Sequence, residues 1–292
     1  MTFNYADFTT RNLGFVTPEE QERLREATVF VCGTGGMGGA AILALVRAGI
    51  GRLMLADIDE FEVSNLNRQV FCTLASVGSH KAEATSAACL QINPDIKIEV
   101  FRNEWPEHVD NLVGGSTVVI NGTDDLAASL LLYRTARTVG KAVIDAYASP
   151  LPSVYVTRSN DPMPEERLGY PTLGTPWDQI SEQQRADSFL REAEYVILNS
   201  SSRHHVDLEL AGQVAAGTRS RMSFAPMVIS TGMLMAYETI ALILERESPT
   251  DAAGWFFNPY KPAIEKPRNR VATALMRPFV TRFLAKMMAS GT

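Results

Sequence analysis

The chain has 292 residues, 46% apolar and 21% charged, which is the composition of a folded globular protein and excludes a disordered or fibrous one. Its formal net charge of −6 argues against partners that need a basic surface, such as DNA or an anionic membrane. The three cysteines lie too far apart for a disulfide framework or paired zinc ligands, and no secretory signal opens the chain, so we expect a cytoplasmic protein without structural zinc.

The first 60 residues predict a strand, helix, strand unit after a short helix. Pro18 follows a threonine and precedes two glutamates, which predicts a helix over 18–26. The apolar run 28–32 is typical of a strand buried on both faces, and a glycine-rich turn follows it. A helix over 40–48 and a strand over 52–56 then complete a βαβ unit of a parallel sheet.

The rest of the chain continues this alternation. We expect strands over 97–101, 117–121, 142–147 and 153–158, and helices over 80–92, 125–138, 181–193, 204–216, 224–246 and 271–289. Residues 159–179 contain four prolines and predict a long crossover loop, whereas 254–270 is irregular or forms short strands. The apolar segment 224–246 is interrupted by polar residues, which favours a buried helix over a membrane span.

These elements predict a single α/β domain with a Rossmann-like, doubly wound and mostly parallel sheet. Within residues 1–292, the nucleotide-binding core covers about 27–149. A crossover and specificity region follows over about 159–222, and a helical and irregular C-terminal region covers 223–292.

The segment Gly33-Thr34-Gly35-Gly36-Met37-Gly38 matches the pattern G-x-G-x-x-G between a strand and a helix. At such a turn, backbone N–H groups and the helix dipole favour a phosphate. Asp57 ends the next strand, 24 residues after Gly33, where an acidic residue accepts hydrogen bonds from ribose. The sequence therefore predicts a nucleotide site, and this pattern alone would also suit a nicotinamide-dependent oxidoreductase.

Further charged residues favour nucleotidyl transfer over hydride transfer. Arg68 and Lys81 follow the second strand, and cations there stabilise charge on a leaving pyrophosphate. Asp124 follows another strand of the sheet and therefore lies on the same carboxyl edge. One carboxylate together with phosphate oxygens is a usual ligand set for Mg²⁺.

A set of motifs runs in order through about residues 11–149: Gly33-Thr34-Gly35-Gly36-Met37-Gly38, Asp57-Ile58-Asp59, Ser64-Asn65-Leu66-Asn67-Arg68-Gln69, Val77-Gly78-Ser79-His80-Lys81, Ile92-Asn93-Pro94 and Thr123-Asp124. With them the chain resembles the E1-like adenylating enzymes, the family of the ThiF, MoeB and HesA proteins. The glycine motif is not specific to that family, but the Asn-Leu-Asn-Arg-Gln segment with its downstream lysine and Thr-Asp is.

The resemblance implies a site for ATP and Mg²⁺. It assigns ATP binding to Gly33, Gly35, Gly36, Gly38 and Asp57. It places around the reacting phosphates Asp59, Asn65, Arg68, Gln69 and Lys81, with Thr123 in the cofactor-binding set and Asp124 as the magnesium ligand. It also implies a homodimer in which Arg11 reaches the partner's site in trans, so that Arg68, Lys81, Asp124 and Arg11 are the catalytic residues.

Two features of many relatives are absent from the sequence, namely paired Cys-x-x-Cys zinc ligands and a crossover-loop cysteine. Cys32 and Cys89 fall in predicted core positions. Cys72, shortly after Arg68, is expected to be partly exposed near the site and is a weak candidate nucleophile. We therefore expect the activated carboxyl group to pass directly to an external nucleophile.

Taken with the resemblance, the sequence predicts an ATP-dependent adenylyltransferase that converts a carboxylate into an acyl adenylate. The expected substrate is the C-terminal carboxylate of a small ubiquitin-like sulfur carrier or of a peptide precursor. Three alternatives stay open: an E1-like cyclic dehydratase that modifies tRNA, a catalytically silent E1-like partner subunit, and the nicotinamide-dependent oxidoreductase. The sequence does not decide which carboxylate is activated or what attacks the adenylate.

Overall fold

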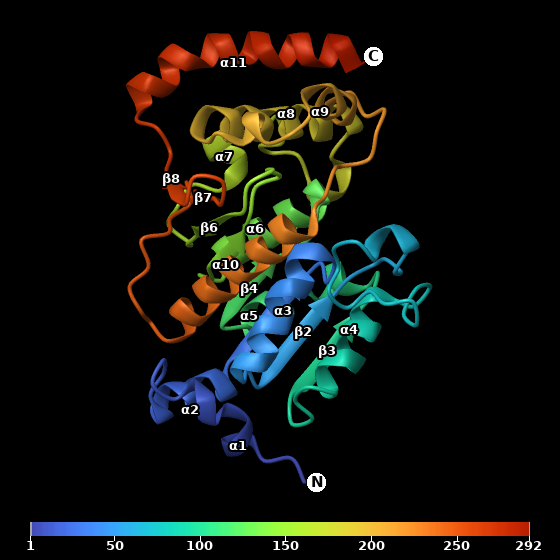
Figure 1. Cartoon of the computed structure of the whole chain (residues 1–292), viewed down its shortest axis with the longest axis vertical. Coiled ribbons are helices and arrows are strands. Elements are labelled where there is room, and N and C mark those ends of the chain that lie inside the picture. Colours follow the sequence, from blue (N-terminus) through green and yellow to red (C-terminus); the bar gives the residue numbers. More distant parts are fainter. Residues whose placement is uncertain (1, 292) are drawn as a thin grey trace.

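A computed structural model describes residues 2–291, with side chains over 2–286. Its centre is an eight-stranded sheet in the order β3-β2-β1-β4-β5-β6-β7-β8 (Figure 1). Neighbouring strands are parallel from β3 to β5, and β6, β7 and β8 extend the sheet in antiparallel fashion. The strands are β1 (Thr28–Cys32), β2 (Arg52–Ala56), β3 (Lys97–Phe101), β4 (Val118–Asn121), β5 (Val143–Asp145), β6 (Ser153–Thr157), β7 (Trp255–Asn258) and β8 (Ala263–Glu265).

The central strands are apolar runs that are buried on both faces. All five residues of β1 are buried, and Val29 lies opposite Leu53 of β2 on one side and Val118 of β4 on the other. The strand order reverses at β1, and ligands of open α/β sheets bind at the carboxyl ends of the strands beside such a point. The mostly parallel, Rossmann-like sheet predicted from the sequence is thus confirmed.

Helices cover both faces of the sheet (Figure 1). On one face Ile42 of α3 and Met235 of α10 join a core cluster with the strands, and on the other Leu112 of α5 and Leu132 of α6 do the same. The α-helices are α1 (Tyr5–Thr9), α2 (Pro18–Glu26), α3 (Gly36–Ala48), α4 (Lys81–Leu90), α5 (Val109–Gly115), α6 (Leu126–Thr138), α7 (Pro164–Leu168), α8 (Glu182–Asn199), α9 (Leu208–Ala215), α10 (Ala225–Ile243) and α11 (Arg270–Gly291).

Helix α10 is long and apolar enough to cross a membrane by length and composition alone. In the fold it packs against α3, and a Cβ on Gly232 would lie only 2.5 Å from Cβ of Ala40. Eight of its residues are buried, among them Met235 and Glu238. As predicted for 224–246, the segment is a packed helix of this fold.

The crossover region lies beyond the carboxyl ends of the parallel strands. Helices α7, α8 and α9 form a layer there, and α11 lies across α8 and α9 (Figure 1). Leu198 of α8 packs with Val280 and Leu284 of α11 in a small separate core cluster. Charged residues of this layer therefore come close to the edge of the sheet where the sequence places the site.

The structure corrects several predicted boundaries in that layer. Residues 159–179 are not a continuous loop, because α7 forms where Pro164 takes the first helical position and Glu166 accepts a hydrogen bond from the backbone N–H of Met163 (2.9 Å). Helix α8 ends at Asn199, six residues beyond the predicted end. The predicted helix 204–216 begins only at Leu208, because Asp207 caps it.

Nearer the N-terminus, α3 starts at Gly36 and not at Ala40. The backbone N–H of Gly39 already donates to the carbonyl of Gly35 (3.0 Å), so the glycines belong to the first helical turn. Helices α1 and α5, with five and seven residues, were not predicted because both are too short to show a clear helical period of apolar residues.

Candidate active site

The glycine turn after β1 brings three backbone segments together. Gly33 has a φ of +88°, and its N–H donates to the carbonyl of Ala56 at the end of β2 (2.7 Å). A Cβ on Gly33 would lie 2.4 Å from the carbonyl carbon of Gly122 after β4, and one on Gly38 would lie 1.9 Å from the oxygen of Gly33. Any side chain at these two positions would push the strand ends and α3 apart.

The N-terminus of α3 offers backbone donors to a ligand. Its cap residue, Gly35, has no side chain that could cap the helix. The N–H groups of residues 36–38 therefore lack intrahelical acceptors, and together with the helix dipole they favour an anion. A Cβ on Gly36 would lie 2.7 Å from Cγ1 of Val228 on α10, so Gly36 is required for packing. The turn fits a nucleotide phosphate.

Asp57 holds this turn to the end of β2. One carboxylate oxygen, Oδ2, accepts hydrogen bonds from the backbone N–H (2.7 Å) and the hydroxyl (3.0 Å) of Thr34. The other, Oδ1, accepts one from the backbone N–H of Asp59 (3.0 Å). Asp57 is 9% exposed, so it orders the turn itself, and contact with a ribose stays a prediction.

The Asn-Leu-Asn-Arg-Gln segment forms a compact turn beside α3. Asn65 is buried, and its carbonyl accepts hydrogen bonds from the N–H groups of Arg68 (3.1 Å) and Gln69 (2.9 Å). The guanidinium of Arg68 donates to the carbonyl of Ser64 (2.9 Å). Gln69 lies against Gly35, and its buried Oε1 has no hydrogen-bond partner among the described residues. An amide group is thus available beside the helix N-terminus.

Lys81 begins α4 and pairs with Asp59. Its Nζ lies 2.7 Å from Oδ2 of Asp59, and its backbone N–H donates to the carbonyl of Asp59 (2.9 Å). The lysine side chain is only 11% exposed, whereas that of Asp59 is 60% exposed. The ammonium group is therefore fixed in position and sheltered from water, which strengthens its interaction with an anion.

Asp124 and Asp125 have different surroundings although they are adjacent. Asp125 caps α6 through Ala128 N–H (2.7 Å) and forms an ion pair with Arg185 of α8. The side chain of Asp124 is 81% exposed, and its ion-pair partner, Arg221, is 4.0 Å away. Thr123 precedes it and accepts a hydrogen bond from Asp125 N–H (3.1 Å). Asp124 is thus an exposed carboxylate, with one long ion pair, at the carboxyl edge of β4.

This carboxylate fits Mg²⁺ of the kind held jointly with a nucleotide. Over residues 2–291, no group of three or more His, Cys, Asp or Glu side chains is arranged to hold a metal ion. Mg²⁺ at nucleotide sites takes one or two carboxylates plus phosphate oxygens, and it needs no such group.

Arg11 does not join the other predicted residues within one chain. It is exposed in a 3₁₀ turn over 10–12, and the amide of Asn12 next to it donates to the carbonyl of Ala48 (3.2 Å). Ala48 ends α3, whose thirteen residues span about 20 Å from the glycine turn. Arg11 therefore lies near the opposite end of that helix from the candidate site.

The cysteines are free and buried, and burial raises the pKa of each thiol. Cys32 and Cys89 are core residues as predicted. The expectation of a partly exposed Cys72 is wrong. Cys72 is 7% exposed, because it packs in the same core cluster as Phe71.

The sequence analysis missed the charged residues that the crossover region adds to this edge. Arg185 of α8 and Arg221 before α10 approach the two aspartates that follow β4. Neither arginine lies in a motif, and each is about 60 or more residues from its partner, so no local pattern could reveal the contact.

A buried polar cluster at the end of β5 was also missed. Asp145 accepts hydrogen bonds from the amide of Asn121 (2.7 Å) and from the hydroxyls of Tyr133 and Tyr155 (2.9 Å each). Burial raises the pKa of Asp145 to about 7, although hydrogen bonds from the Ala146 N–H and from the two tyrosine hydroxyls oppose the shift.

Comparisons with known proteins agree with the fold and the motif region. The chain is 39% identical over 126 residues to the SAMP-activating enzyme E1 of Haloferax volcanii, covering 43% of this chain and 47% of that protein. It is 34% identical over 130 residues to the sulfur carrier protein adenylyltransferase of Thermus thermophilus, covering 44% and 48%. The chain thus matches about half the length of these relatives.

Among solved structures, Escherichia coli MccB with ATP is similar in fold, with a TM-score of 0.62. Its sequence identity is 17%, over 93% of this chain and 75% of that one. The model of the ThiF family matches residues 9–274, which is most of the sequence. The chain therefore belongs to the ThiF family.

Proposed function

We propose that this protein is an ATP-dependent adenylyltransferase. The observation that carries the proposal is the meeting, at one edge of the sheet, of the open N-terminus of α3, the sheltered Lys81 and the exposed Asp124. Such a set is suited to a triphosphate that loses pyrophosphate. Two similar proteins, one an activating enzyme and the other an adenylyltransferase by name, support the same chemistry.

In the proposed reaction a carboxylate oxygen attacks the α-phosphorus of ATP, the bond from that phosphorus to the bridging oxygen breaks, and pyrophosphate leaves. The backbone N–H groups at the start of α3 orient the phosphates. Lys81 and Arg68 neutralise charge as it develops on the pyrophosphate. Asp124 would hold Mg²⁺, and the ion would supply further charge neutralisation when bound.

We propose that the substrate is the C-terminal carboxylate of a small ubiquitin-like protein or of a peptide, and that the crossover region over 159–222 sets specificity within a single cytoplasmic domain. The burial of all three described cysteines supports direct transfer of the acyl group to an external nucleophile. The position of Arg11 at the far end of α3 supports a homodimer in which Arg11 acts on the partner's site.

The test is release of pyrophosphate from ATP by the whole chain with Mg²⁺, offered a small ubiquitin-like protein with a free C-terminus or with a C-terminal amide. We expect release only with the free carboxylate, and a loss of about a hundredfold or more in Lys81→Ala and Asp124→Asn. Lys97→Ala is the matched control, because Lys97 is exposed on β3.

Other outcomes would reject the proposal in distinct ways. Release only with tRNA would favour the dehydratase. Binding of Mg-ATP without release on any carboxylate would favour a silent subunit. Thermal protection by NADH and not by Mg-ATP would favour an oxidoreductase.

A further inference from the structure

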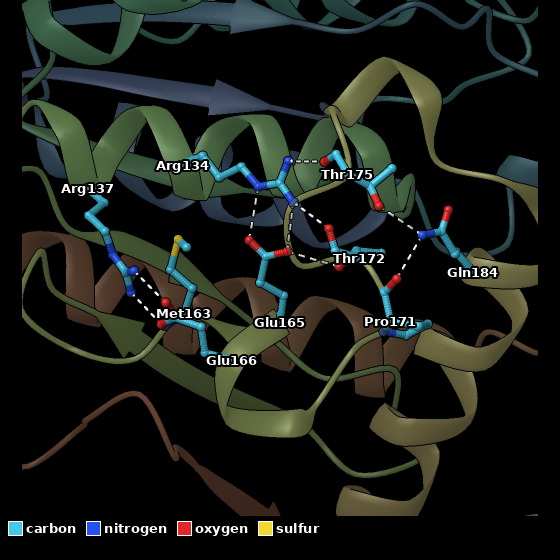
Figure 2. Close-up of polar contacts among 9 residues, drawn as sticks. All are labelled: Arg134, Arg137, Met163, Glu165, Glu166, Pro171, Thr172, Thr175 and Gln184. Atoms are coloured by element: carbon cyan, nitrogen blue, oxygen red, sulfur yellow. Dashed lines mark hydrogen bonds and ion pairs between the residues drawn. The ribbon is translucent and has the colours of Figure 1, made fainter.

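Helix α7 is held to α6 by two bidentate ion pairs (Figure 2). Arg134 donates from Nε to Oε1 (2.9 Å) and from NH2 to Oε2 (2.8 Å) of Glu165. Arg137 binds both carboxylate oxygens of Glu166 at 2.7 Å. Glu165 is 1% exposed, so the first pair is almost removed from water. Two consecutive residues of α7 are therefore fixed relative to the sheet.

The segment after α7 is fixed by the same arginine (Figure 2). Arg134 also donates to the carbonyls of Thr172 (3.1 Å) and Thr175 (2.7 Å). The hydroxyl of Thr172 donates to Glu165 (2.9 Å), and Gln184 of α8 donates to the carbonyl of Pro171 (2.7 Å). These contacts fix helix α7 and the segment after it relative to α6 and α8.

Arg167, the next residue of α7, is different from these paired arginines. Its NH2 donates to the hydroxyl of Tyr147 (3.1 Å), but Nε and NH1 are buried without a hydrogen-bond partner in the described part of the chain. The guanidinium carbon lies 4.8 Å from the ring centre of Tyr195 and 5.8 Å from those of Tyr147 and Tyr155. Three N–H donors of a permanent cation are left without an oxygen acceptor.

Aromatic faces compensate such a cation only in part. A buried charge is costly unless it is paired and hydrogen-bonded, and arginine is the residue that best matches a carboxylate. The hydroxyls of Tyr147 and Tyr195 both donate to the carbonyl of Ala253 (2.7 and 2.8 Å), so they offer Arg167 only neutral oxygen acceptors. Among the described residues, no carboxylate forms an ion pair or a hydrogen bond with Arg167.

Arg167 and the three tyrosines around it, Tyr147, Tyr155 and Tyr195, form a cluster whose position connects it with the candidate site. Tyr147 follows β5 and Asp124 follows β4, and these neighbouring strands are parallel, so both lie on the carboxyl edge. Glu192 of α8 accepts a hydrogen bond from the backbone N–H of Ala148, the residue after Tyr147 (2.7 Å), and Arg221 and Arg167 oppose the rise in the pKa of its carboxyl that burial causes. Arg221 in turn reaches Asp124. A row of charged groups thus leads from the proposed magnesium ligand to Arg167.

The strand order indicates which reactant would occupy the cluster. Nucleotide phosphates are expected at the turn after β1. Tyr147 follows β5, and Tyr155 in the middle of β6 pairs with Asp145 at the end of β5, so both lie about 10 to 15 Å away across strands spaced by about 4.8 Å. Asp124 lies between the two. The cluster is therefore on the side from which the second reactant, the carboxylate substrate, would approach.

We propose that Arg167 binds a second carboxylate of the substrate, within about three residues of the carboxyl group that is activated. This inference rests on the proposed function, and it assigns Arg167 to substrate specificity. The reacting carboxylate itself is not the ligand, because an ion pair with Arg167 would weaken it as a nucleophile and hold it away from Asp124.

The test uses the whole chain labelled with ¹⁵N-arginine and glutarate as the probe. The Nε–H signal of Arg167, assigned by its loss in Arg167→Lys, should move saturably as glutarate is added. The signal of Arg134 should stay in place, because its Nε already donates to Glu165. If Arg167→Lys does not fold, Arg167→Gln gives the assignment, and the titration itself needs no variant.

A stationary Arg167 signal at saturating glutarate would overturn the proposal. Movement with Mg-ATP alone would also overturn it, because the oxyanion would then be a phosphate. With an acidic peptide or protein substrate, Arg167→Lys should raise KM for the carboxylate at least about tenfold and leave KM for ATP unchanged. Arg191→Lys, at an exposed position of α8, should change neither value.

The two proposals fail separately. Movement of the Arg167 signal with glutarate but no pyrophosphate release on any substrate would reject adenylation and keep the carboxylate site. Pyrophosphate release with a stationary signal would do the reverse.

Discussion

The two parts of the carboxyl edge are stabilised by different means. Around the glycine turn, backbone segments touch directly, and Gly33 and Gly38 leave no room for a methyl group. In the crossover region, side chains far apart in sequence form ion pairs and hydrogen bonds, as Arg134 and Glu165 do. The first part should therefore be sensitive to added volume and the second to lost charge.

The largest expected effect is that of Gly38→Ala. Its Cβ would lie 1.9 Å from a backbone oxygen that cannot move without displacing the turn, so we expect a loss of more than about 4 kcal/mol in the free energy of unfolding. Gly140→Ala is the control, because its φ of +72° is also positive but nothing lies within 4 Å. It should cost about 1 kcal/mol. Equal midpoints in urea for both variants would contradict the close-packing account.

The second effect depends on pH and concerns Asp145. Because its pKa is raised from 3.8 to about 7, the folded state binds the proton more tightly than the unfolded chain does between these values. Stability therefore falls as pH rises from about 4 to about 7, by up to about 4 kcal/mol from this group. Relative to Asp145→Asn, the wild-type chain should lose stability over that range in urea titrations. A constant difference between the two would show that the folded pKa is not raised.

Third, neutralising Glu165 should lower the free energy of unfolding more than neutralising Glu166 does. Glu165→Gln leaves Arg134 without its buried partner, for which we expect a loss of about 3 kcal/mol. Glu166→Gln breaks a pair that is about one third exposed on both sides and should cost under about 1 kcal/mol. Similar losses, measured by chemical denaturation, would mean that the two ion pairs do not differ in this way.

The smallest effect on stability is expected for Asp124→Asn. The side chain is mostly exposed and its pair with Arg221 is long, so the free energy of unfolding should change by less than about 0.5 kcal/mol. The same variant should nevertheless lose pyrophosphate release if Asp124 holds Mg²⁺. A large loss of stability would instead assign Asp124 a structural role.

The sequence by itself determined the part of the fold that contains the glycine turn. Strand, turn and helix over 28–56 are local in the chain, and the residues Gly33, Asp57 and Lys81 lie within 50 positions of one another, so period and spacing were sufficient to predict the fold class and where the motifs meet. The strands β1 and β2 and the helices α2 and α3 were predicted for the same reason. Boundaries were less certain where glycines enter a helix, as at Gly36.

Only the tertiary structure decided the rest. Three properties depend on elements that are distant in sequence: whether Asp57 faces solvent or holds Thr34, whether Cys72 is exposed, and whether an arginine such as Arg134 or Arg167 has a carboxylate partner. Burial and ion pairing are properties of packed surfaces, and the chain carries no local pattern for them. Arg134 and Arg167 are the same residue type, and their surroundings alone distinguish a structural ion pair from a cation that has no carboxylate partner among the described residues.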